Sequence, residues 1–167
     1  MVFNRRQFAM CGAAAATAAL GGAKFCAAAP PANQAGAFEV TRSDAEWRRL
    51  LTPAQYAVLR TGKTERAGSS SLDSEKRPGT FHCAGCDLPL FSSATKFDSG
   101  TGWPSFWKPL DHAIDTRKEG VLLFEQTEVH CRRCGGHLGH VFDDGPKPTG
   151  LRYCMNGVAM TFKPAAA

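Results

Sequence analysis

The sequence predicts a single, mainly β domain built of antiparallel sheets and preceded by short helices. Beyond Gly79, no long stretch repeats its apolar residues with the period of a helix. Short apolar runs instead alternate with glycine and proline turns, and the clearest are Val121 to Val129, Gly150 to Tyr153 and Val158 to Phe162. Two Cys-x-x-Cys turns, Cys83 to Cys86 and Cys131 to Cys134, lie among these runs and can join neighbouring loops.

The first 37 residues have the features of an export signal. Residues 4–8 read Asn-Arg-Arg-Gln-Phe and precede a moderately apolar run at 9–23, a pattern that resembles a twin-arginine signal. Small residues suited to cleavage place the start of the mature chain between Ala29 and Phe38. We therefore expect an export signal and cleavage region at 1–37, a domain at 38–167 and an exported, periplasmic protein.

The charge of the predicted mature domain argues against nucleic acid as a partner. The whole chain carries a net charge of +5, and residues 1–37 contain three basic residues and no acid, so the remainder carries +2. That is too little for an electrostatic footprint on nucleic acid. The apolar run is also shorter than the about 20 residues of a membrane span. We expect no stable span after cleavage, and the alternative is an uncleaved N-terminal anchor.

Two short helices are predicted after a linker at 30–42. Ser43 or Asp44 can cap the first, while Thr52-Pro53 can begin the second before Gly62 ends it. Apolar residues at helical spacing give both helices a packing face: Trp47, Leu50, Leu51, Tyr56 and Leu59. Residues 63–79 are polar and rich in serine, which predicts a surface loop.

The two Cys-x-x-Cys turns have the spacing of metal ligands: Cys83, Cys86, Cys131 and Cys134. Four thiolates complete a tetrahedral shell around one zinc ion and leave no position open for substrate, so we expect a structural site that joins two loops. The alternative is a pair of redox disulfides, but the 44 residues between the turns and their matched flanks favour zinc. His82 and His130 precede ligand cysteines and are expected to pack or to support the ligands.

Cys154 stands apart from the paired cysteines and is a candidate nucleophile. Arg152 and two histidines, His137 and His140, can favour its thiolate, the form that attacks an electrophile. The alternatives are a buried structural thiol and a pair of core or edge histidines. His112 lies in a predicted surface loop and is assigned no role.

Three segments together resemble the signatures of the B-type peptide methionine-R-sulfoxide reductases. They are Lys96 to Phe106, Gly136 to Pro146 and Arg152 to Asn156, and the two cysteine turns fit the zinc-bearing branch of that family. The similarity runs from Trp47 to Phe162. It implies an enzyme that reduces the R epimer of methionine sulfoxide in proteins and peptides, here repairing oxidised exported proteins.

The resemblance also implies a role for each matching residue. Cys154 matches the nucleophile, which becomes a sulfenic acid as methionine leaves. His140, with His137, matches the groups that supply the proton to the sulfoxide oxygen. The remaining matches are Asn156 and Arg152, which orient this network and favour the thiolate, Trp103, which receives the S-methyl group, and Phe142 and Asp144 for lining and orientation.

One position departs from the pattern of many family members. Thr101 stands where they have a resolving cysteine, which forms a disulfide that thioredoxin reduces. We expect an external thiol, such as that of a thioredoxin-like protein, to reduce the sulfenic acid directly; the alternatives are a displaced zinc cysteine and Cys26 of an uncleaved chain. Two other functional classes stay open: a non-catalytic zinc-stabilised binding module and an exported thiol-disulfide oxidoreductase.

Overall fold

The computed structural model describes residues 38–120 and 125–166. The predicted export signal and cleavage region at 1–37 lies outside the described residues, as does the beginning of the apolar run that starts at Val121. Within the described ranges, the helices are too short to cross a membrane.

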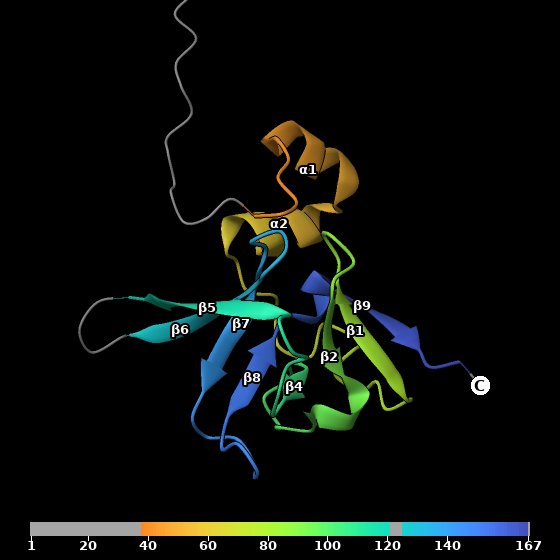
Figure 1. The fold of residues 1–167 in the computed structure, drawn as a ribbon, viewed down its shortest axis with the longest axis vertical. Helices are drawn as coiled ribbons and strands as arrows, with labels where there is room; N and C mark the ends of the chain where they lie inside the picture. Colours follow the sequence, from red (N-terminus) through yellow and green to blue (C-terminus); the bar gives the residue numbers. More distant parts are fainter. Residues whose placement is uncertain (1–37, 121–124, 167) are drawn as a thin grey trace, which may run out of the picture. The chain divides into compact units, whose positions relative to one another are not determined.

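Both predicted helices form, and each begins at a capping box. In α1 (Asp44–Leu50), the cap is Ser43, whose side chain exchanges hydrogen bonds with Glu46. In α2 (Pro53–Thr61), Thr52 and Gln55 form the equivalent pair, and Gly62 ends the helix in the left-handed conformation at φ 67°. Figure 1 shows the two helices beside one another at one end of the sheets. The backbone N–H groups at the start of each helix therefore find hydrogen-bond acceptors in residues next to them in sequence.

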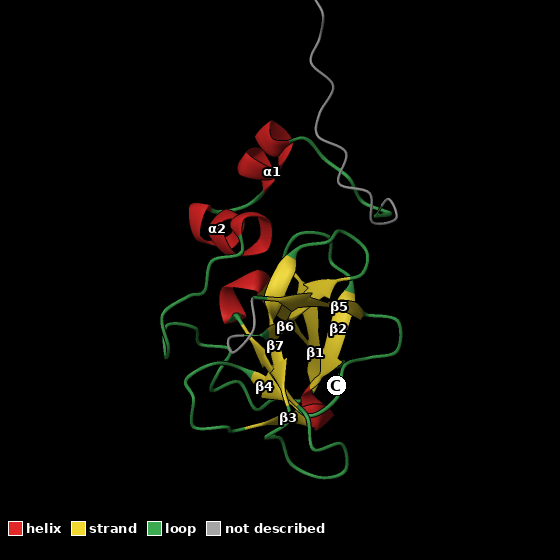
Figure 2. Ribbon diagram, turned by 90° about the vertical axis from the view of Figure 1, so that its left-hand side faces the viewer, coloured by secondary structure: helices red, strands yellow, loops and turns green. Residues whose placement is uncertain are grey.

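The remainder of the described chain is mainly β, which confirms the predicted class. One sheet has three antiparallel strands in the order β2-β1-β9, and the other has six in the order β3-β4-β8-β7-β6-β5 (Figures 1 and 2). The strands are β1 (Gly79–Cys83), β2 (Pro89–Ser92), β3 (Lys96–Phe97), β4 (Ser105–Phe106), β5 (Ile114–Glu119), β6 (Gln126–Cys131), β7 (His137–Phe142), β8 (Arg152–Met155) and β9 (Met160–Pro164).

Short 3-10 turns connect several of these strands. One, η1 (Ser93–Thr95), follows β2, and another, η3 (Gly157–Ala159), links β8 to β9. The predicted run from Val158 to Phe162 is therefore a turn followed by a strand, rather than one strand. The change of conformation directs the chain from the larger sheet to the smaller one.

Aromatic side chains join the two sheets in the core. Phe106 of β4 stacks on Phe91 of β2 with ring centroids 4.4 Å apart, and meets the edge of Phe81 of β1 at 4.9 Å. All three are fully buried. Such pairs contribute about 0.5–1.5 kcal/mol each beyond the area that they bury. Because neighbouring residues of a strand face opposite sides, Ser105 and Cys154 face away from this aromatic cluster.

Candidate active site

A row of functional side chains crosses one face of the larger sheet. Cys154 of β8 pairs with Ser105 of β4 on one side and with His140 of β7 on the other. The row continues from His140 to Glu128 of β6 and then to Arg117 of β5. Directly paired residues project to the same face with their Cβ atoms about 5 Å apart. The strand register therefore places a thiol, an imidazole and a carboxylate next to one another.

A β-bulge brings His137 to the same side as His140. Residues three apart in a regular strand face opposite sides, but the register between β6 and β7 shifts at Val129/His130. The two imidazoles consequently lie with ring centroids 5.3 Å apart, edge to face. Burial, followed by the proximity of His137, lowers the pKa of His140. The two histidines therefore lie side by side, but only His140 lines the cavity beside Cys154, and His137 lines another with Arg60 and Glu128.

Backbone proximity between β7 and β8 requires a glycine at position 139. A Cβ atom there would lie 2.1 Å from the carbonyl oxygen of Cys154 and 3.0 Å from the Cα atom of Met155. The absence of a side chain at Gly139 therefore allows the two backbones to approach this closely.

Cys154 opens into a cavity of about 260 Å³. Five of the predicted site residues line it, together with Thr64, Gln126 and Gly139: Trp103, His140, Phe142, Cys154 and Asn156. The cavity combines aromatic walls with a thiol and an imidazole. It can therefore hold a small apolar group beside a polar atom that needs a proton.

Arg152 and Asp144 support the cavity without lining it. The Arg152 guanidinium donates two hydrogen bonds to Asp144, from Nε at 2.8 Å and Nη2 at 2.7 Å. It also covers the ring of Phe142 at 4.5 Å from the centroid. The pKa of Arg152 is raised, first by its hydrogen bonds to Asp144 and further by its interaction with Cys154. Asp144 was predicted to line the site or to orient its groups. It is hydrogen-bonded to Arg152 and is not among the residues that line the cavity.

The polar loop at 63–79 contributes Glu65, which sequence reasoning missed. The indole Nε1 of Trp103 donates to the Glu65 carbonyl oxygen at 3.2 Å, and the amide Oδ1 of Asn156 accepts from the Glu65 backbone nitrogen at 2.9 Å. The Glu65 carboxylate accepts hydrogen bonds from the backbone of Gly157 and Val158. The buried Asn156 also donates to the Leu138 carbonyl oxygen at 3.1 Å. Glu65 thus connects Trp103 to Asn156, and no local sequence pattern indicates this.

Thr101 lies directly against the candidate nucleophile. The Oγ1 atom of Thr101 is 3.9 Å from the Cys154 sulfur. The hydroxyl of Ser99 lies 2.8 Å from that of Thr101 and 2.7 Å from that of Ser105. The position that the sequence resemblance matches to a resolving cysteine is therefore in contact range of Cys154, but it carries a hydroxyl.

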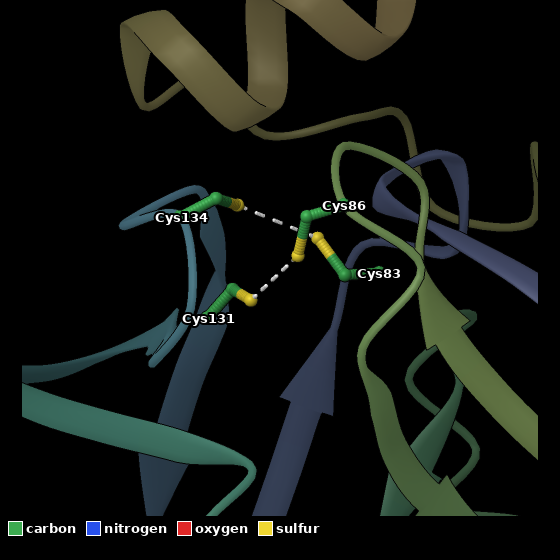
Figure 3. Close-up of side chains that lie close together, drawn as sticks. All are labelled: Cys83, Cys86, Cys131 and Cys134. Atoms are coloured by element: carbon green, nitrogen blue, oxygen red, sulfur yellow. Dashed lines mark hydrogen bonds between the residues drawn. The ribbon is translucent and has the colours of Figure 1, made fainter. Parts of the chain in front are cut away.

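Four cysteines from two turns form a cluster with the dimensions of a metal site (Figure 3). Their sulfurs all lie within 4.8 Å of one another, with Cys83 and Cys134 3.7 Å apart and Cys86 and Cys131 3.5 Å apart. Tetrahedral zinc with bonds of about 2.3 Å separates its sulfur ligands by about 3.8 Å. Four negative charges this close repel one another, so four thiolates together need a cation among them. The four cysteines therefore fit a metal ion bound by four thiolates.

The two cysteine turns have the same backbone structure. In the first, Cys83 accepts from the nitrogen of Asp87 at 2.8 Å and donates to the carbonyl oxygen of Leu88 at 2.9 Å. In the second, Cys131 makes the equivalent bonds at the same two distances, with Gly135 and Gly136. The fifth residue of each turn is left-handed, with φ 60° at Asp87 and φ 66° at Gly135. The repeated sequence motif thus folds as a repeated structure.

The other predicted histidines stay outside the metal cluster. The ring of His82 contacts Asp87, and His130 Nδ1 lies 3.5 Å from the Glu128 carboxylate. Their expected supporting roles stay predictions. His112 is exposed, as expected.

Comparison with known proteins identifies close relatives. A family model described as the SelR domain matches residues 51–164. A peptide methionine sulfoxide reductase MsrB of Leptospira interrogans is 50% identical over 127 residues, covering 75% of this chain and 97% of the relative. One from Pseudomonas putida (strain W619) is 56% identical over 121 residues, covering 71% and 90%. A chloroplastic peptide methionine sulfoxide reductase B1 of Arabidopsis thaliana is 49% identical, covering 71% and 59%.

We expect Cys131→Ser to remove a bound metal ion and to lower the free energy of unfolding by roughly 5 kcal/mol or more, because structural metal binding is coupled to folding. Metal analysis and thermal unfolding measure the two effects. Cys154→Ser is the control and should keep both the metal and the unfolding temperature. Loss of activity in Cys131→Ser with unchanged stability would instead indicate a catalytic metal.

We expect Gly139→Ala to separate β7 from β8 and to destabilise the domain by about 1–3 kcal/mol, because the added methyl group overlaps the backbone of Cys154. Denaturant unfolding measures this. Gly85→Ala is the control, since its Cβ atom would meet only atoms at 3.6 Å or beyond. Equal stability of the two variants would contradict the role given to Gly139.

Proposed function

The chain belongs to the SelR domain family, and we propose that it is a peptide methionine sulfoxide reductase selective for the R epimer in oxidised proteins. The observation that carries the proposal is the pairing of Cys154 with His140 at a cavity whose walls include Trp103 and Phe142. A nucleophile, a proton donor and an apolar surface are the three elements that sulfoxide reduction needs.

Cys154 begins the reaction as a thiolate. Its sulfur attacks the sulfoxide sulfur while the sulfoxide oxygen gains a proton from His140, directly or through water. The thiolate, the sulfoxide and one proton become a cysteine sulfenic acid and methionine, so Cys154 loses the two electrons that the sulfoxide gains. Arg152 favours the thiolate through its positive charge, and Asp144 holds the guanidinium in place.

The aromatic walls bind the substrate side chain. Trp103 and Phe142 offer apolar surface to the S-methyl group, a soft and polarisable group that suits an aromatic face. The hydrogen bond from Trp103 to Glu65 and the bonds of Asn156 fix the wall relative to β8. This fixed geometry is what would distinguish the two epimers of the sulfoxide.

One zinc ion bound by Cys83, Cys86, Cys131 and Cys134 completes the proposed enzyme. Its chemistry is structural, because four thiolates leave no coordination position for the substrate. The cluster joins the end of β1 to the end of β6 and is therefore a link between the two sheets.

An external thiol reduces the sulfenic acid in this proposal. Among the described cysteines, Cys154 alone lies outside the metal cluster, and Thr101 occupies the neighbouring position. A thioredoxin-like protein or a small dithiol would attack the sulfenic sulfur and release water. The twin-arginine-like segment at 4–8 supports an exported enzyme that repairs exported proteins in the periplasm.

The first test measures reduction of the separate R and S epimers of a methionine sulfoxide peptide, with either dithiothreitol or thioredoxin as the reductant. We expect turnover of the R epimer alone. Turnover of neither epimer by metal-loaded protein would favour a binding module. Disulfide exchange by the paired cysteines would favour the thiol-disulfide oxidoreductase.

We predict that Cys154→Ser lowers R-sulfoxide turnover by at least about a thousandfold, because the hydroxyl is a far weaker nucleophile than the thiolate. Steady-state methionine formation measures the loss. Metal content and unfolding temperature should match the unsubstituted protein. Substantial remaining turnover would show that another group is the nucleophile.

We predict that Thr101→Cys raises thioredoxin-dependent turnover severalfold, because the contact at 3.9 Å puts the introduced thiol within reach of the sulfenic acid. Condensation of the two groups releases water and leaves a disulfide, which mass spectrometry detects after a single turnover. Thr101→Ser is the matched control and should form no disulfide. Absence of the disulfide in Thr101→Cys would contradict the geometry described for this position.

A further inference from the structure

Glu128 is a buried carboxylate that the proposed reaction does not yet use. It lies in the middle of β6, is 4% exposed and is directly paired with His140 across the strands. Buried carboxylates are rare unless they are paired, because burial removes their hydration. The contacts of Glu128 must therefore compensate for the lost hydration of its carboxylate.

Both oxygens of Glu128 are engaged by cationic or donor groups. Oε1 lies 2.8 Å from Nδ1 of His137, and Oε2 forms an ion pair with the Arg117 guanidinium at 2.8 Å. His130 Nδ1 is 3.5 Å from Oε2. Burial raises the pKa of Glu128, but the nearby His130, the hydrogen bond with His137 and the charge of Arg117 together lower it further than burial raises it. Glu128 is therefore ionised.

An ionised carboxylate determines which nitrogen of His137 carries the proton. It can only accept hydrogen bonds, so His137 must donate from Nδ1, and in the neutral ring Nε2 is then an acceptor. Nε2 is buried and has no hydrogen-bond partner within residues 38–120 and 125–166. The ring edge of one histidine meets the face of the other at 5.3 Å. Glu128 thus holds the Nδ1 side of His137, and Nε2 is the unpartnered nitrogen of the ring within the described residues.

We propose that Glu128 is a positioning residue for the reduction: it fixes His137 with its proton on Nδ1 and supplies the negative charge that stabilises the protonated histidine pair. This inference rests on the proposed reductase function. Each turnover takes one proton from the pair as the sulfoxide oxygen is released from methionine and Cys154 becomes the sulfenic acid. The pair regains that proton from solvent.

The charge of Glu128 determines the direction of the expected pH effect. Burial and His137 lower the pKa of His140, whereas the negative charges of Glu119 and then Glu128 raise it and so favour its protonation. The rate falls as pH rises through the pKa of the donor. Removing the charge of Glu128 should therefore move the alkaline limb to lower pH. The other charged or titratable groups around the pair are Arg60 on α2, Arg117 and Glu119 on β5, His130 on β6, and Arg152 and Cys154 on β8.

The experiment compares Glu128→Gln with Glu125→Gln in the full chain. Glutamine can still accept from His137 but lacks the charge, and Glu125 is an exposed acid paired with Lys118. Pre-reduced protein is mixed with excess R-sulfoxide peptide without reductant, and the single equivalent of methionine is followed across pH. For Glu128→Gln, we expect a rate about tenfold lower at neutral pH, an unchanged KM and an alkaline limb at lower pH. Glu125→Gln should match the unsubstituted protein.

A purely structural role for Glu128 predicts a different result. In that case Glu128→Gln would unfold at lower temperature, but the rate per folded molecule and the pH profile would match those of Glu125→Gln, and this would overturn the inference. No turnover by the unsubstituted protein would instead overturn the proposed function.

A second measurement needs no variant and decides the case in which Glu128→Gln fails to fold. Nitrogen-15 spectra of the histidines in the unsubstituted chain, at a pH where His137 is neutral, distinguish its two tautomers. We expect the proton on Nδ1. A proton on Nε2 would overturn the inference, because Glu128 could not then hold the ring as proposed.

Discussion

The close approach of β7 to β8 at Gly139 is the constraint on which the site depends. It lets His140 pair with Cys154 in register, and the bulge beside it brings His137 to the same side. Asn156 reinforces this contact, since its backbone nitrogen and its amide nitrogen both donate to the Leu138 carbonyl oxygen. The reactive groups are thus positioned mainly by hydrogen-bonded strands, which deform less readily than loops.

The sulfur atoms of the cysteine cluster and the sulfur atom of Cys154 lie in different surroundings. Paired thiols at the ends of β1 and β6 lie in two equivalent turns and fit a metal ion, while the unpaired thiol faces a cavity. The α2 helix packs beside the cluster: Arg60 donates to the carbonyl oxygen of Cys134 at 3.0 Å, and Leu59 contacts Gly136. Local packing therefore separates the four clustered thiols from the thiol that we propose to be reactive.

Sequence reasoning recovered the features that depend on neighbouring residues. The helix caps, the cysteine turns and the strand containing Cys154 all have local signals. The strand β5 (Ile114–Glu119) does not, because this exposed strand reads Ile-Asp-Thr-Arg-Lys-Glu and lacks apolar alternation. Glu65 and Glu128 were missed for a different reason: their partners are identified only by the folded register, and Glu65 lies 91 residues from Asn156.

A hydroxyl at Thr101, in contact with Cys154, would change which oxidised form of Cys154 persists in the proposed cycle. A thiol at this position would meet the sulfenic acid at a high effective concentration, set by the fold and independent of the surroundings. With threonine there, the sulfenic acid of the proposed cycle would persist until an external thiol meets it, whereas a cysteine would leave a disulfide for the external reductant. When the supply of external thiol falls, such an enzyme would therefore accumulate as the sulfenic acid and not as a disulfide.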